Sequence, residues 1–152
     1  MAHARQQIRE AIVARLANLP TTGPRVYKTR IYPSGDEHLP GISIYTASES
    51  MVESGRDAAF REWRRLTITI EGRVKPPEGT DPDDQLDDIA AEVESALMSE
   101  HTLGNRLKGL RLQNTSTAFD DSLERPVGLV LLTWEAKYCV DARDPSVLPY
   151  AQ

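Results

Sequence analysis

The chain has 152 residues, a formal net charge of −5 and one cysteine. A domain of this length buries roughly 70% of the surface that its unfolded chain exposes, so it can form a core without disulfides or metals. The single Cys139 excludes an internal disulfide, and the sequence has no apolar targeting segment and no run of about 20 apolar residues. We therefore expect one soluble domain of a reducing compartment, spanning residues 1–152, with no membrane partner.

The first elements are an amphipathic helix and two β segments. Near the N-terminus, apolar residues recur at helical spacing: Ile8, Ala11, Ile12, Leu16 and Leu19. Pro20 and Gly23-Pro24 should end that helix. Residues 25–31 form a weakly patterned strand, 32–36 have turn chemistry, and 41–45 form a short strand. Two β segments in succession predict antiparallel pairing.

Residues 46–60 show little apolar periodicity and predict a long mobile loop or an extended hairpin arm. Arginines on or near this arm would be available to a partner: Arg56, Arg61, Arg64 and Arg65. The alternative is a flexible connection with no further role.

A strand and an acidic helix follow. From Leu66 to Lys75 apolar and polar residues alternate, which predicts a strand with one dry face. After a Pro/Gly linker, Asp81 suits the N-cap of a helix and Pro82 its first position. The helix has an apolar stripe of Leu86, Ile89, Ala90, Val93 and Leu97, and the rest of its surface carries Asp83, Asp84, Asp87, Asp88 and Glu94.

The last elements are two strands and a tail. Residues 110–119 predict a moderately polar strand, 120–126 a hairpin connection, and 127–140 the longest strand. With the order helix, three strands, helix, two strands, we expect an α+β domain: a twisted, mainly antiparallel five-stranded sheet with both helices on one face. Residues 141–152 should form an irregular tail that wraps a neighbour or stays loose.

Charge is distributed unevenly along the chain. The first 31 residues carry six Lys and Arg against one Glu, whereas residues 76–105 carry nine acids and no Lys or Arg. The acidic helix face is either simply solvated, or it meets a basic surface of a neighbouring copy in a homo-oligomer. Specific nucleic-acid binding is not expected, because the basic residues lack a clustered stripe with interleaved aromatics.

No pattern of catalytic or metal-binding residues is found. His3, His38 and His101 are scattered, and Asp36-Glu37-His38 is only a weak candidate metal cluster. The acidic run 81–88 lacks the central Gly and terminal Glu of a calcium loop. Cys139 has no histidine near it in sequence and is expected to be a structural thiol. We therefore expect neither an enzyme nor a cofactor.

Taken together, the segments resemble the tail terminator proteins of long-tailed bacteriophages, the minor tail protein U family. The resemblance rests on the order of elements and on local patterns in five segments: 9–16, 39–45, 65–74, 86–94 and the strand that begins at Pro126-Val127-Gly128 and ends at Tyr138.

By that resemblance the protein would be a structural virion protein at the head-proximal end of the tail, assembled in the host cytoplasm. It would form a hexameric ring on the finished tail tube, stop tube polymerisation and present a surface to the head-completion protein, with DNA passing through the ring. Its partners would be further copies of itself, the tail tube protein and the head-completion protein. The candidate interface residues are the four arginines above with Asp83, Asp84, Asp87 and Asp88. The alternatives are another head–tail connector or neck protein and, from a different class, a small-molecule-binding α+β domain.

Overall fold

The computed structural model describes residues 1–31, 35–77, 79–120 and 127–151, and the side chains of all of these except 53–56 and 120. Its elements are α1 (Ala4–Leu16), β1 (Val26–Tyr27), the short 3-10 helix η1 (Asp36–His38), β2 (Gly41–Arg56), β3 (Arg61–Val74), α2 (Pro82–Met98), β4 (Gly109–Asp120) and β5 (Val127–Asp141). They form one α+β domain with a mixed five-stranded sheet in the order β1-β2-β3-β5-β4. The predicted fold class and element order are confirmed.

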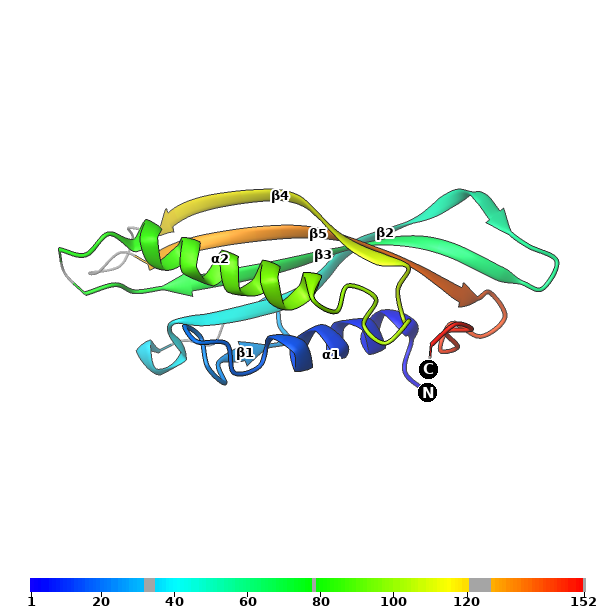
Figure 1. The fold of residues 1–152 in the computed structure, drawn as a ribbon, viewed down its shortest axis with the longest axis horizontal. Coiled ribbons are helices and arrows are strands. Elements are labelled where there is room, and N and C mark those ends of the chain that lie inside the picture. The colour runs from blue at the N-terminus through cyan, green and yellow to red at the C-terminus, as the bar shows by residue number, and fades with distance from the viewer. Residues whose placement is uncertain (32–34, 78, 121–126, 152) are drawn as a thin grey trace.

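Both helices cover the same face of the sheet (Figure 1). α2 contacts β3 and β5, and α1 contacts β2 and α2. The covered face is the dry face predicted for residues 66–74, and the buried cluster joins it to the helix stripes: Ile8, Ile12 and Leu16 of α1, Leu66, Ile68 and Ile70 of β3, Leu86, Ile89, Val93 and Leu97 of α2, and Leu132 and Trp134 of β5. Two amphipathic helices and one amphipathic sheet therefore share a single core.

Local signals place α2 as the sequence predicts. The Asp81 carboxylate accepts a hydrogen bond from the backbone N–H of Asp83 at 2.9 Å, and Pro82 occupies the first turn. Gly72 of β3 lets the helix approach the sheet, because a Cβ there would lie 3.0 Å from Ile89 Cγ2 and 2.9 Å from Val130 Cγ1. α2 thus rests directly on the strand pair β3–β5.

The first two strands pair in parallel, so the prediction of an antiparallel pair is wrong. Val26 and Tyr27 lie opposite Ile42 and Ser43, and β1 has only these two residues. A parallel pair needs a connection of about a dozen residues to carry the chain back to the same end of the sheet, and the segment between Tyr27 and Gly41 has that length. A tight hairpin was therefore not required.

The segment 46–60 forms an extended hairpin, the second of its two predicted forms. β2 runs to Arg56 and β3 begins at Arg61, with irregular pairing between Thr46 and Ser48 and between Met51 and Arg56. In Figure 1 this hairpin extends beyond the helices at one end of the molecule, which we call the hairpin end.

The tail after β5 packs against its own chain. Ala4 N–H donates to the carbonyl of Pro145 at 2.7 Å, and the Gln7 side-chain amide donates to that of Ser146 at 2.7 Å. Leu148 is buried with the core, while Tyr150 lies over the start of β3. The tail thereby closes the hairpin end of the core.

The turn expected at 32–34, the connection at 121–126 and the side chain of Arg56 lie outside the described residues. No helix in the described part of the chain is both long enough and apolar enough to cross a membrane.

Candidate assembly surfaces

The three histidines and Cys139 were considered as candidate catalytic or metal-binding residues, and each has its own local surroundings. Among the described residues, no three His, Cys, Asp or Glu side chains are placed to hold a metal ion. His3 accepts the N–H of Arg5 at 3.1 Å as the N-cap of α1, His38 bonds the hydroxyl of Tyr27 at 2.8 Å, and His101 is exposed. Burial raises the pKa of Cys139, which keeps the thiol protonated and unreactive.

Of the four predicted arginines, the three with described side chains do not form one patch. Arg61 pairs with Asp57 at 2.8 Å and donates to the hydroxyl of Tyr150 at 2.7 Å. Arg65 is 42% exposed and lies 3.8 Å from Glu135, on the sheet face away from the helices. Arg64, the next residue along the strand, points to the helix side, as alternation requires.

Arg64 belongs to a mostly buried polar network centred on Glu49. The Glu49 carboxylate accepts hydrogen bonds from Arg64 at 3.1 Å, Arg5 at 3.2 Å and the Tyr138 hydroxyl at 2.6 Å. Arg64 also pairs with Glu62 at 2.8 Å, and its side chain is only 13% exposed. Burial, followed by the hydrogen bond to Glu49, raises the pKa of Tyr138. The charge of Arg64 is therefore used inside the chain, at the base of the hairpin.

The acidic residues of α2 do form a patch. Asp83, Asp84, Asp87 and Asp88 are exposed, and none of them has an ion-pair partner among the described residues. Phe119, 52% exposed, lies beside them: it is opposite Gly128, whose missing Cβ would face Pro82 and Leu86 of α2. We call these four aspartates and Phe119 the acidic end; in Figure 1 it is opposite the hairpin end.

A basic, aromatic cleft of about 360 Å³ lies toward the hairpin end. Its apolar wall consists of Trp63, Leu107, Cys139, Leu148 and Tyr150, with the rings of Trp63 and Tyr150 stacked 6.0 Å apart. Lys108 and Lys137 place their ammonium groups 5.7 and 5.8 Å from the centre of the Trp63 ring, and Arg106 lines the rim. We call this set the basic cleft.

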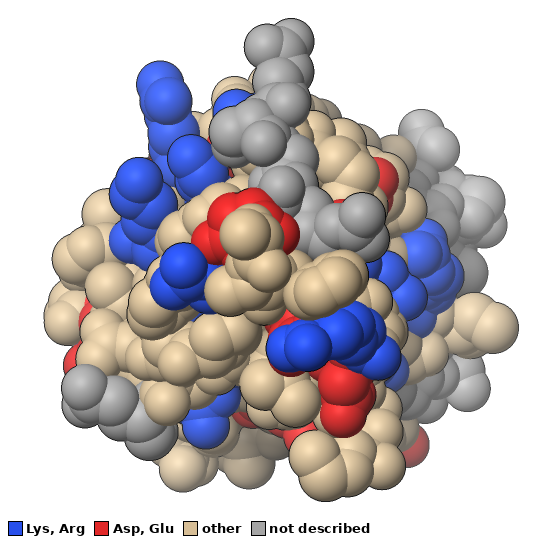
Figure 2. Space-filling model, turned by 90° about the vertical axis from the view of Figure 1, so that its right-hand side faces the viewer, with Lys and Arg blue, Asp and Glu red and all other residues tan. Residues whose placement is uncertain are grey.

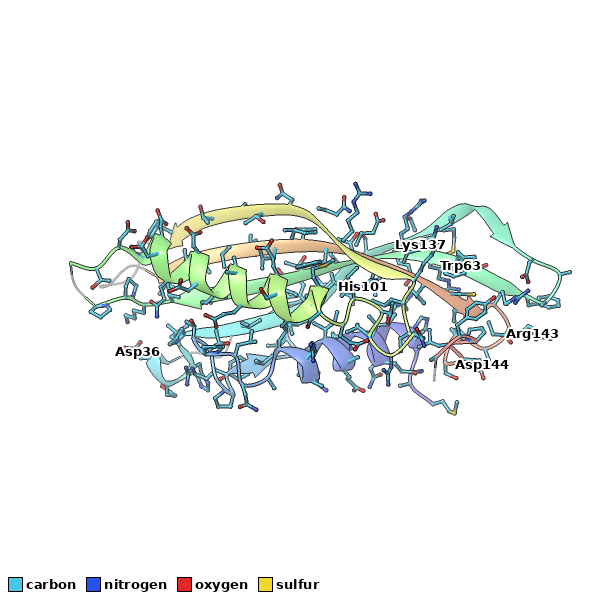
Figure 3. All side chains as sticks on the ribbon, in the orientation of Figure 1. Asp36, Trp63, His101, Lys137, Arg143 and Asp144 are labelled. Atoms are coloured by element: carbon cyan, nitrogen blue, oxygen red, sulfur yellow. The ribbon has the colours of Figure 1, made fainter. Side chains whose placement is uncertain are left out.

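The described part of the chain places no carboxylate against the cations of the basic cleft. Among the described residues Arg106, Lys108 and Lys137 have no ion-pair partner, whereas Arg61 and Arg143 pair with Asp57 and Asp141. Figure 2 views this end of the molecule and shows Lys and Arg side chains spread over it, and Figure 3 places Trp63 and Lys137 side by side. The basic cleft was not predicted from the sequence, because its residues come from four separate segments.

β4 is a further exposed element. It forms one edge of the sheet, and every residue from Gln113 to Phe119 is exposed. The stretch contains no charged residue and no proline, the usual means by which proteins prevent a free edge from pairing with another chain. A free edge of this kind is suited to intermolecular contact.

No protein-family model matches this chain, and no curated protein does. Among solved structures, it is similar to a chain of a structure described as "Virion of native gene transfer agent (GTA) particle", at 19% sequence identity and a TM-score of 0.51. The match covers 89% of this chain and 90% of that chain. The likeness establishes a shared fold that extends over nearly the whole of both proteins.

Proposed function

We propose that this chain is a structural protein of a phage-like virion and, within it, the tail terminator. The observation that carries the proposal is the fold shared with a virion chain over 89% of this chain and 90% of the other. A match that covers nearly all of both chains is expected of two proteins with the same assembly role. The order of elements that resembles the tail terminator family supports the finer assignment.

In this role, copies of the chain form a ring on the finished tail tube, at the end nearest the head. The ring blocks addition of further tube subunits and offers its other side to the head-completion protein. A cyclic ring needs two different patches on each copy that fit one another. We assign the acidic end and the basic cleft to this pair because their charges are opposite, and the free edge of β4 to a further contact with a neighbour or with the tube.

The same surfaces do not favour an enzymatic role. Among the described residues no three His, Cys, Asp or Glu side chains are placed to hold a metal ion, and the cleft is walled mainly by apolar side chains. We propose that the protein has no catalytic activity and needs no cofactor.

Deletion of this chain from the phage or prophage that encodes it tests the tail role directly. Electron microscopy should show overlong tails that do not join heads, and expression of the intact chain should restore tails of uniform length. Tails of normal length that fail to join heads would instead indicate the head–tail connector alternative. Normal virions would refute both.

A further inference from the structure

The acidic end and the basic cleft lie toward opposite ends of the longest axis of the molecule (Figures 1 and 3). The acidic end carries Asp83, Asp84, Asp87 and Asp88, and the basic cleft carries Arg106, Lys108 and Lys137, all without ion-pair partners among the described residues. One copy cannot bring its own two ends together. A second copy of the chain is able to bring opposite charges to both surfaces.

The acidic end is a compact set of groups. Asp83 and Asp87, and likewise Asp84 and Asp88, are four residues apart, so each pair stands side by side on the helix surface. Phe119 supplies an exposed aromatic ring next to the first turn of α2. The acidic end therefore combines several carboxylates with one large apolar side chain.

The basic cleft complements that set in both respects. Its wall of Trp63, Leu107, Leu148 and Tyr150 offers apolar contact, and its volume of about 360 Å³ leaves room for a side chain of the partner. Lys108 and Lys137 flank the Trp63 ring and can reach carboxylates that lie over it. Apolar contact at the centre with charges at the margin is the usual layout of a protein–protein interface.

We propose that the acidic end of one copy docks into the basic cleft of the next copy, with Phe119 entering the cleft and the α2 aspartates facing Arg106, Lys108 and Lys137. The contact joins two different patches, so it is heterologous and repeats head to tail until it closes into a ring. The inference rests on the proposed function in that both require self-association, and it assigns the contact to named residues. It replaces Arg61, Arg64 and Arg65, whose charges have partners inside the chain.

Charge reversal on each side, in the full chain, tests the contact. The cleft variant carries Lys108→Glu and Lys137→Glu, and the helix variant carries Asp84→Lys and Asp88→Lys. Light scattering and native mass spectrometry over a concentration series should show wild-type assemblies and a loss of about tenfold or more in the apparent association constant for each variant. Association of the wild type should weaken as salt is raised, because exposed charges are screened.

Mixing gives the sharper result. In an equimolar mixture, the reversed helix of one variant faces the reversed cleft of the other, while the remaining junction is wild type. Alternating rings therefore have complementary charges at every contact, and association should return. A single chain carrying all four reversals should also assemble by itself.

Two controls separate charge from folding and apolar contact. Lys28→Glu and Glu37→Lys reverse exposed charges outside both surfaces and should assemble as the wild type does. Circular dichroism should give all variants the thermal midpoint of the wild type to within a few degrees. Phe119→Ser should weaken association about tenfold without altering any charge.

Several results would overturn the inference: a wild-type chain that stays monomeric at every concentration, single-side variants that assemble normally, or a mixture that fails to recover. Rings that persist in the single-side variants and still cap tails would reject this contact and leave the proposed tail role standing. Recovery of association in the mixture, together with normal tails in the deletion strain, would support this contact and reject the proposed tail role.

Discussion

Arg64 and Arg65 are adjacent in sequence, yet their removal should have very different effects on stability. The Arg64 guanidinium holds two carboxylates, Glu49 at 3.1 Å and Glu62 at 2.8 Å, and its side chain is 13% exposed. Removing one partner of a buried ion pair costs about 3–5 kcal/mol, because the remaining charge is left in a poor environment. Since Arg5 and Tyr138 still contact Glu49, we take the low end and expect Arg64→Ala to lower the free energy of unfolding by about 3 kcal/mol.

Arg65→Ala is the matched control. Its side chain is 42% exposed and 3.8 Å from a Glu135 carboxylate that is itself 35% exposed. Such surface pairs contribute about 0–1 kcal/mol, so we expect a change within about 0.5 kcal/mol. At about 2–4 °C per kcal/mol for a chain of this size, thermal unfolding followed by circular dichroism should show Arg64→Ala about 6–12 °C lower and Arg65→Ala almost unchanged. Equal midpoints for the two variants would refute the buried network.

Three further predictions concern other contacts. Burial raises the pKa of Tyr138, so the folded state keeps a proton that the unfolded chain releases above about pH 10, and wild-type stability should fall as pH rises further. Tyr138→Phe should lower the free energy of unfolding by about 1–2 kcal/mol at pH 7 and show a flatter alkaline decline of stability in urea titrations. The backbone hydrogen bond from the N–H of Arg61 holds the pKa of Asp57 below its usual range, so the hairpin turn should loosen as pH falls through that lowered pKa. Asp57→Asn should abolish this pH dependence in backbone NMR shifts, and an unchanged profile would exclude Asp57 as its cause. Gly72→Val should cost about 1–3 kcal/mol or more in denaturant unfolding, because the new side chain collides with Ile89 and Val130; a neutral result would mean that α2 can move away from β3.

The parts of the fold that the sequence predicts well are those with local signals. α2 begins where Asp81 and Pro82 indicate, and the dry face of β3 follows the alternation from Leu66 onward. The hairpin of β2 and β3 was harder to predict from the sequence, because the helix face of β3 before Leu66 carries a charged network instead of apolar residues. Without an apolar face, alternation gives no signal.

Non-local features were beyond such patterns. The direction of β1 relative to β2 depends on where the chain returns to the sheet, which no residue in either strand encodes. The partnership of Arg64 with Glu49 depends on the register across β2 and β3, which shifts between Thr46 and Ser48. Alternation does place Arg64 and Arg65 on opposite faces, but only the register shows which of them has an internal partner.

The aspartates of the acidic end could be predicted from the sequence and the basic cleft could not, because only the former lie close together along the chain. The aspartates of α2 lie within six residues of one another on one helix, whereas the basic cleft combines the start of β3, residues 105–108, the end of β5 and the tail. A charge count along the chain detects the first arrangement only. Arg61, Arg64 and Arg65, which were predicted as candidate interface residues, have carboxylate partners within the chain.

The energetics of α2 explain why its acidic face favours a partner. Asp83 and Asp84 gain from the positive end of the helix dipole, but Asp87 and Asp88 lie one turn further on, where that effect has declined. Each pair four residues apart repels by about 0.2–0.5 kcal/mol, and the described residues provide no cation to offset it. This repulsion destabilises a monomer only slightly, and the exposed carboxylates favour its solubility. A neighbouring copy that brings Lys108 and Lys137 to these carboxylates would remove the cost in the assembled state alone, so the same residues favour a soluble monomer before assembly and a defined contact after it.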